Sequence, residues 1–332
     1  MKKFFTRVRL VTLLTLSAYS LSAQKAFWSD VSESNINATS EQRKIVPNKY
    51  RTVSLDTVGM LALLDRAPME FTQQSKTNPL TISIPMPDGS FSRFNIVKST
   101  IMEPGLSAQY PYFRTLGGQG IDDPYATIKI DWTCFGFRAQ ILSPISGRVY
   151  IEPYSFASQL FYTSFYKKDL SPKGTFVEEM DKETMTKTLP RTNATCVGGI
   201  LRTYRLAIAC TGEYARAVGF GTAVTVPQAL SAIVTTTNRV DGVYETEVSI
   251  RLVLIANNST IVFTDPATDP FNGNNNASTL ITESQTQITN RIGTVNFDIG
   301  HTVSTGGGGL AGLGVVCNSS QKARGITVWP IS

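Results

Sequence analysis

The sequence has 332 residues, of which 42% are hydrophobic and 17% charged, an ordinary balance for a globular protein long enough to form two domains. Its formal charge of +6 depends on four basic residues among the first nine; without them, 27 basic and 25 acidic residues leave +2. This small charge gives no reason to expect a nucleic acid or an anionic membrane as a partner.

Residues 1–23 have the features of a secretory signal peptide: a basic start, an apolar run from Leu10 to Leu16, and the small residues Ser22 and Ala23. We predict cleavage after Ala23 and a secreted or extracytoplasmic location. The alternative, a membrane anchor, would need roughly 20 apolar residues, and serine and threonine interrupt this run. No later stretch is apolar enough to span a bilayer, so we expect no membrane partner after cleavage.

Residues 24–167 predict a β-rich domain. Leu80, Ile82 and Ile84 alternate with polar residues, Asp88 and Gly89 supply a turn, and the alternation resumes towards Ile96, which predicts a hairpin. Two prolines without N–H donors place its first strand at a sheet edge. Further alternating runs follow as far as residue 151, so we expect an antiparallel sheet or a sandwich.

Residues 168–200 are rich in Lys, Glu, Asp and Thr with scattered Pro and Gly, which is typical of a linker. Lys187 and Arg191 would be accessible to a processing protease, or the segment is only a solvated tether. Cys196 lies near the end of this stretch, immediately before the next domain.

Residues 201–332 predict an α/β domain. A strand ends at Cys210, a helix capped by Thr225 follows, and a second strand covers residues 248–254. Strand, helix and buried strand in this order imply a parallel pair. A second helix capped by Ser278 leads to a short strand at residues 295–299.

The last part of the sequence is rich in glycine. Four consecutive glycines, residues 306–309, cannot form a stable helix, and we expect a loop leading into a short apolar strand over residues 310–316. Backbone must approach something closely there. Such an edge would let an extended peptide add as an extra strand, whereas the alternative is a tight turn inside the core.

The segments 201–210, 229–244, 248–257, 297–301 and 309–317 resemble, in order, the N-terminal part of the catalytic domain of reprolysin-like metzincins, which are secreted zinc metalloendopeptidases. The resemblance implies an incomplete, mixed and mostly parallel α/β domain after a β-rich propeptide. It also implies that a protein or peptide substrate lies on the glycine-rich strand, at Gly309, Leu310, Ala311, Gly312 and Leu313.

The zinc motif of that family, HExxHxxGxxH, is absent from the sequence, which contains a single histidine, His301. Because even the minimal motif needs two histidines, we expect no catalytic residues, no bound zinc and no activity in this chain as it stands, although the complete family protein requires zinc. No nucleophile elbow or P-loop offers other chemistry. We also transfer no calcium site, since Arg205 stands where relatives often carry an acidic residue.

The sequence contains four cysteines, and without a CxxC pair they do not predict a zinc ribbon. In family zymogens a propeptide cysteine can bind the catalytic zinc, and Cys196 has the corresponding place. The alternative for Cys196 is a disulfide, for example with Cys210. The resemblance implies that Cys317 would pair with a cysteine beyond the zinc helix.

We therefore expect a secreted, zymogen-type metallopeptidase precursor that is truncated before its metal site. The rival hypothesis is a secreted, noncatalytic protein that binds extended peptides through its β-edge. A third is a purely structural β protein.

Overall fold

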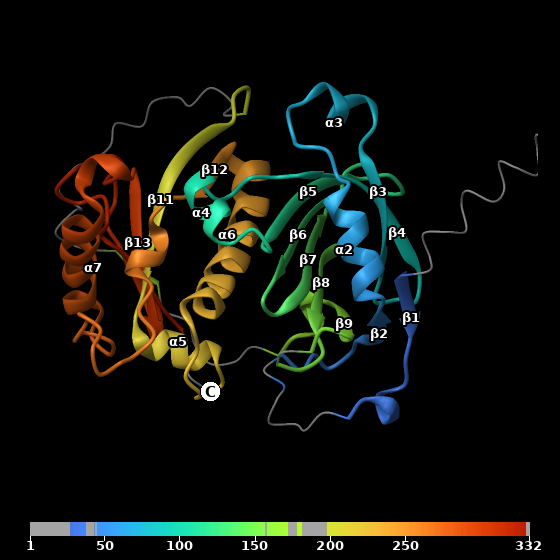
Figure 1. Cartoon of the computed structure of the whole chain (residues 1–332), viewed down its shortest axis with the longest axis horizontal. Coiled ribbons are helices and arrows are strands. Elements are labelled where there is room, and N and C mark those ends of the chain that lie inside the picture. Colours follow the sequence, from blue (N-terminus) through green and yellow to red (C-terminus); the bar gives the residue numbers. More distant parts are fainter. Residues whose placement is uncertain are drawn as a thin grey trace, which may run out of the picture.

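The computed structural model describes residues 27–37, 43, 45–156, 158–171, 178–180 and 198–329. These residues form two sheets, one in each half of the chain (Figure 1). The signal-peptide prediction and Cys196 lie outside the described residues. Among the helices of the described ranges, none combines the length and the apolar character that a membrane span requires.

The N-terminal half forms a nine-stranded antiparallel sheet with the order β1-β2-β9-β8-β7-β6-β5-β4-β3. Its strands are β1 (Trp28–Asp30), β2 (Arg51–Leu55), β3 (Leu80–Pro85), β4 (Phe91–Lys98), β5 (Arg114–Gly120), β6 (Thr127–Thr133), β7 (Gly136–Ser143), β8 (Gly147–Pro153) and β9 (Phe161–Tyr166). Its α-helices are α2 (Thr57–Asp65), α3 (Gln73–Thr77) and α4 (Pro104–Gln109).

The predicted hairpin is confirmed. Strands β3 and β4 pair antiparallel, and the turn between them contains Gly89 with φ +95°, a conformation that glycine adopts at no steric cost. Strand β3 is also the last strand of the sheet order, as the prolines predicted.

The C-terminal half forms a mixed, mostly parallel sheet with the order β10-β14-β15-β13-β11-β12. Among its described strands, only β14 and β15 pair antiparallel. The strands are β10 (Glu178–Met180), β11 (Arg202–Cys210), β12 (Ile250–Leu254), β13 (Ile299–Thr305), β14 (Gly308–Ala311) and β15 (Gly325–Trp329). The α-helices are α5 (Gly212–Val218), α6 (Val226–Val248) and α7 (Ala277–Ile292). The predicted α/β domain is therefore present.

Several predicted boundaries in this half were wrong. The strand after α6 begins at Ile250, because Val248 still belongs to the helix and Ser249 ends it in the left-handed region with φ 55°. Helix α7 is capped by Asn276, whose side chain accepts from Thr279 N, and not by Ser278. The strand expected at residues 295–299 instead begins at Ile299. Thr225 does cap α6, with Gln228 completing a capping box.

The expected linker, residues 168–200, is not only a tether, because strand β10 lies within it and joins the C-terminal sheet. The described residues also form 3-10 turns at Glu33–Asn35, Lys167–Asp169, Asn258–Ile261 and Thr294–Asn296.

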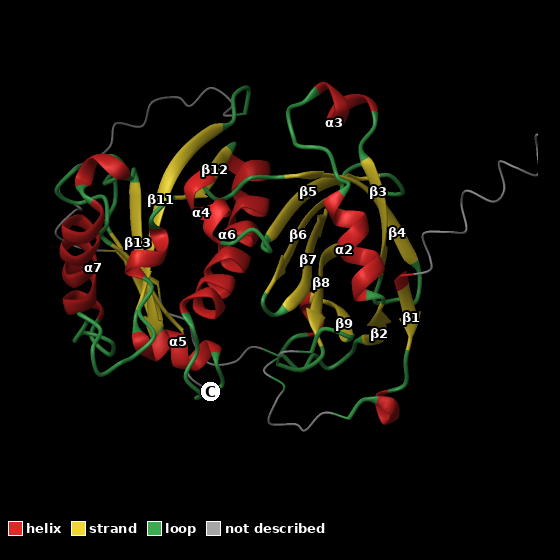
Figure 2. Ribbon diagram, viewed as in Figure 1, coloured by secondary structure: helices red, strands yellow, loops and turns green. Residues whose placement is uncertain are grey.

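Helix α6 lies between the two sheets (Figures 1 and 2). It contacts β12 of its own sheet and β6 and β7 of the N-terminal sheet. Helix α7 covers the other face of the C-terminal sheet, and α2 covers the other face of the N-terminal sheet. The molecule is thus built in five layers, with α6 as the central one.

The hydrophobic cores follow these layers. One core joins α2 to the apolar face of the N-terminal sheet, and another lies between α7 and the C-terminal sheet. The core around α6 is shared: Ile101, Met102, Leu106 and Phe113 of the N-terminal half are buried together with α6 and the C-terminal strands. The two halves are therefore not independently packed.

Candidate functional site

The glycine-rich end forms the tight connection between β13 and β14. Gly306 has φ +143° and Gly308 has φ +114°, values that side chains rarely adopt. A Cβ on Gly306 would lie 3.3 Å from Asn274 O and 3.4 Å from Val328 Cβ. Gly306 and Gly308 are favoured here by their backbone conformation, and Gly306 also lies close to Asn274 and Val328.

The strand predicted over residues 310–316 is shorter than expected. It is β14, Gly308–Ala311, and the chain then enters turns, with Gly312 N donating to Arg324 O at 2.9 Å and Gly314 at φ +66°. Of the five residues predicted to bind substrate, Gly309, Leu310 and Ala311 lie on the strand. Gly312 and Leu313 follow it, and Leu313 is 47% exposed. Their role in peptide binding stays a prediction.

Strand β14 presents one backbone edge to β15 and the other to β10. In the parallel ladder with β10, Glu178 pairs with Gly309, Glu179 with Leu310 and Met180 with Ala311. On its other side β14 pairs antiparallel with β15. The edge at which the sequence predicted an added peptide strand therefore carries one, and it comes from the chain's own linker.

His301 lies inside the sheet, on β13 between β11 and β15. Its Nε2 lies 3.0 Å from Thr327 Oγ1, and desolvation lowers the pKa of the ring to about 4, so it is neutral at pH 7. A ring held in this way by a neighbouring strand has the geometry of a structural histidine.

A catalytic zinc ion does not fit the residues present. Among the described residues, no group of three His, Cys, Asp or Glu side chains is arranged to hold a metal ion. The only histidine of the sequence is engaged with Thr327. A mechanism that depends on zinc therefore cannot be derived from this chain.

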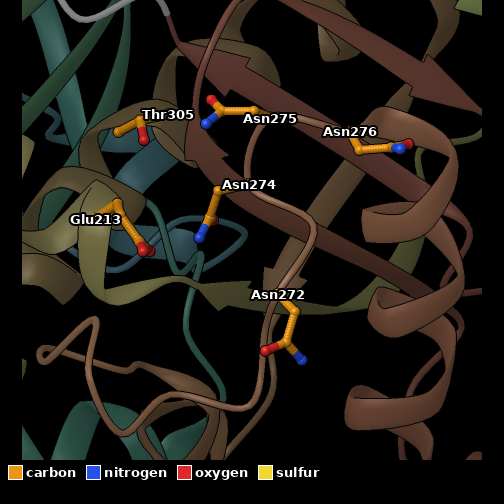
Figure 3. A pocket seen from close by; sticks show the side chains of 6 residues that line it. All are labelled: Glu213, Asn272, Asn274, Asn275, Asn276 and Thr305. Atoms are coloured by element: carbon orange, nitrogen blue, oxygen red, sulfur yellow. The ribbon is translucent and has the colours of Figure 1, made fainter.

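A polar pocket of about 440 Å³ lies where the parallel strands β11 and β13 end, and its walls are shown in Figure 3. It is lined by Glu213, Asn272, Asn274, Asn275, Asn276 and Thr305. Glu213 Oε2 is buried and has no hydrogen-bond partner among the described residues. The pocket lies beside the turn that leads into β14, since Thr305 is the last residue of β13.

The loop over residues 265–276 carries two Asp and four Asn side chains. In the structure its side chains bind backbone groups: Asp269 accepts from Gly212 N at 2.6 Å and Phe271 N at 2.8 Å, and Asn276 caps α7. Burial raises the pKa of Asp269, and the negative charge of the neighbouring Glu213 adds to this rise. The two backbone hydrogen bonds oppose it.

Arg205 pairs with Asp298. Its Nη2 lies 2.8 Å from Asp298 Oδ1, its backbone N donates to Oδ2 at 2.8 Å, and this bonding lowers the pKa of the carboxyl. The guanidinium thus supplies the positive charge beside Asp298, at the position where the resemblance would have suggested an acidic residue.

Three cysteines fall within the described residues, and no disulfide joins them. Cys210 is buried, its Sγ donates to Phe263 O at 3.4 Å, and burial raises the pKa of its thiol to about 12. Cys317 is exposed, and its backbone N donates to Asp298 O. The prediction of a zinc-binding or disulfide-bonded Cys196 stays a prediction.

Ion pairs that were not predicted from the sequence join the two halves, and they involve Glu70, Lys129, Glu245 and Arg251. One signal was available, since Arg251 interrupts an otherwise apolar strand. A charge at such a position must find a partner or remain exposed.

The family model for metallo-peptidase family M12B, reprolysin-like, matches residues 200–329. A search of the curated proteins found no match. The matched range begins just before β11 and ends with β15, so it covers the C-terminal sheet apart from β10.

Proposed function

Starting from the reprolysin-like character of residues 200–329, we propose that this chain is the precursor form of a secreted zinc metalloendopeptidase, with the N-terminal β domain as its propeptide. Peptidases of this class act on proteins or peptides, and metallopeptidase character is what the family match supports. Secretion is proposed from the signal-peptide pattern of residues 1–23. The 332 residues as they stand do not hydrolyse peptides, because they lack the histidines for zinc.

The observation that carries the proposal is the ladder between β10 and β14. A peptide substrate that adds to a sheet edge gains backbone hydrogen bonds along an exposed strand. Strand β14 has that place in the C-terminal sheet, and the linker strand Glu178–Met180 already pairs with it. In the proposed precursor the linker therefore blocks the edge that a substrate would use.

The same observation favours the second candidate function, a noncatalytic protein that captures extended peptides. The ladder with β10 supports it, because strand β14 pairs there with an extended segment through backbone hydrogen bonds. The two functions differ in whether peptide binding at this edge is coupled to hydrolysis.

The peptide-binding edge that both functions require is tested by replacing Glu178–Met180 with Gly-Ser-Gly and measuring the binding of a fluorescent peptide that has the sequence of residues 174–185. We expect the variant to bind this peptide measurably more tightly than the unaltered chain, because the edge of β14 is free. The matched control carries the same replacement at residues 183–185, beyond the ladder. Equal binding to all three proteins would refute a peptide-binding edge at β14.

A further inference from the structure

The N-terminal sheet buries a polar face. Strand β6 alternates, with Ile128 and Ile130 in the core beside α2 and Lys129 and Asp131 on the opposite face. In an isolated sheet this second face would be in water, yet Lys129 is 7% exposed and Asp131 only 2%. Helix α6 of the reprolysin-like domain covers it.

The buried polar groups of this face find their partners on α6. Asn238 Nδ2 donates to Ile130 O at 3.0 Å, and Thr235 Oγ1 donates to Asp131 Oδ1 at 2.7 Å. Both α6 side chains are themselves buried. A polar group that is buried without a hydrogen-bond partner is costly, so within the assembled chain each domain supplies partners for polar groups that the contact buries on the other.

Charges are paired across the same boundary. Lys129 Nζ lies 2.7 Å from Glu245 Oε2, and these side chains are 8% and 19% exposed. Glu152 of the N-terminal sheet, 4% exposed, pairs with Arg239 of α6. Separating the domains would break these ion pairs and expose their charges to water. It would also expose the apolar side chains that are packed around α6.

A second contact closes the free edge of the C-terminal sheet. Residues 101–103 run beside β12, where Leu254 N donates to Ile101 O and Glu103 N donates to Leu254 O, both at 2.8 Å. Helix α4 then places Leu106, which is fully buried, in the core around α6. Gly105 permits this approach, since a Cβ there would lie 2.8 Å from Ala256 Cβ.

We propose that the N-terminal domain is a permanent partner of the reprolysin-like domain and remains bound after the linker is cut. The interface combines a shared apolar core with buried hydrogen bonds and ion pairs, as obligate interfaces do. By contrast, the ladder between β10 and β14 covers only three residues. Cutting the linker would therefore release β10 more readily than it releases the domain. This inference concerns association and does not depend on peptidase activity.

The test uses the full chain with a recognition site for a specific protease inserted between Lys187 and Arg191. After cleavage under reducing conditions, which exclude a disulfide link, the mass in solution is measured by size-exclusion chromatography with light scattering at micromolar concentration. We expect one particle whose mass is the sum of both fragments. Elution of two separate fragments would overturn the proposal.

Two variants at α4 make the test specific. Leu106→Glu places a charge in the shared core, and we expect the dissociation constant of the cut fragments to rise by roughly 100-fold or more. Ala108→Glu adds the same charge to the same helix at an exposed position, and its fragments should stay together. Equal association of the two variants would overturn the assignment of this contact.

If the Leu106→Glu chain fails to fold, hydrogen exchange in the protein without substitutions tests the proposal instead. In the cut but otherwise unaltered protein, amides of Val226–Val248 should exchange as slowly as in the uncut protein, because the N-terminal sheet still covers α6. Exchange of this helix that becomes roughly tenfold faster on cleavage would contradict the proposal.

Discussion

Glu70 of the N-terminal domain and Arg251 of β12 form an ion pair across the domain boundary, with 2.6 Å between Glu70 Oε1 and Arg251 Nη1. Their side chains are 11% and 9% exposed. Arg251 also pairs with Glu245 at 2.6 Å, and Glu245 with Lys129, so the four side chains form a chain of alternating charges. Glu70 and Lys129 are its two ends.

Replacing Glu70 with alanine should lower the free energy of unfolding by about 2–3 kcal/mol, because it leaves the buried Arg251 with one carboxylate instead of two. Chemical denaturation of the full chain measures the change. The control is Arg216→Ala, which removes an exposed pair with 3.7 Å between Arg216 Nη2 and Asp265 Oδ1 and should cost less than about 1 kcal/mol. A Glu70→Ala effect no larger than the control would contradict the energetic role given to the pair.

Asp241 on α6 should make the free energy of unfolding depend on pH. Its Oδ1 accepts from Leu252 N at 2.8 Å, whereas Oδ2 is buried without a hydrogen-bond partner among the described residues. Burial raises the pKa of the carboxyl to about 7, and the negative charge of Glu245 adds to this rise. The positive charges of Lys129 and Arg251 oppose it.

Between pH 4 and 7 the unfolded chain has lost the Asp241 proton while the folded chain retains it. The contribution of Asp241 to the free energy of unfolding is therefore greatest near pH 4. It falls as the pH rises to about 7 and stays low above that. Asp241→Asn should remove the penalty, raising the free energy of unfolding at pH 8 by at most about 4 kcal/mol and leaving it unchanged at pH 4. Thermal unfolding at both pH values measures this; a variant less stable at pH 8 would show that the charge is favourable there.

The chain should hold no stoichiometric zinc and should not hydrolyse casein, since the described residues contain no suitable ligand group and the sequence one histidine. Metal analysis after dialysis and a casein assay with and without chelator check both points. One tightly bound zinc per chain together with chelator-sensitive hydrolysis would refute this prediction.

The predicted role of Cys196 can be tested in a chimaera that carries a relative's zinc helix and C-terminal lobe after residue 332. If the Cys196 thiolate binds the zinc, at about 2.3 Å, it keeps the precursor latent. Cys196→Ala should then cleave peptide before propeptide removal, while the parent and a Cys134→Ala control stay latent. Equal latency in all three, or a mapped disulfide between Cys196 and Cys210, would reject the switch.

The sequence by itself determined the local elements and their order. Alternation predicted the hairpin of β3 and β4, the Thr225 cap and the helical spacing predicted α6, and the glycines marked the turn into β14, because each of these signals depends on neighbours in the chain. It also excluded a three-histidine zinc site, since counting histidines needs no structure. Helix and strand ends were less certain, as at Ser249, because a single left-handed residue decides them.

Only the tertiary structure decided what covers each surface. Lys129 and Asp131 have the pattern of a solvent-exposed strand face, and nothing in their neighbourhood indicates that a helix about a hundred residues later buries them. In the same way, the composition of residues 168–200 is typical of a linker and did not predict strand β10, which pairs with β14. Burial and edge pairing depend on contacts between distant segments, and such contacts leave little trace in the local sequence of either partner.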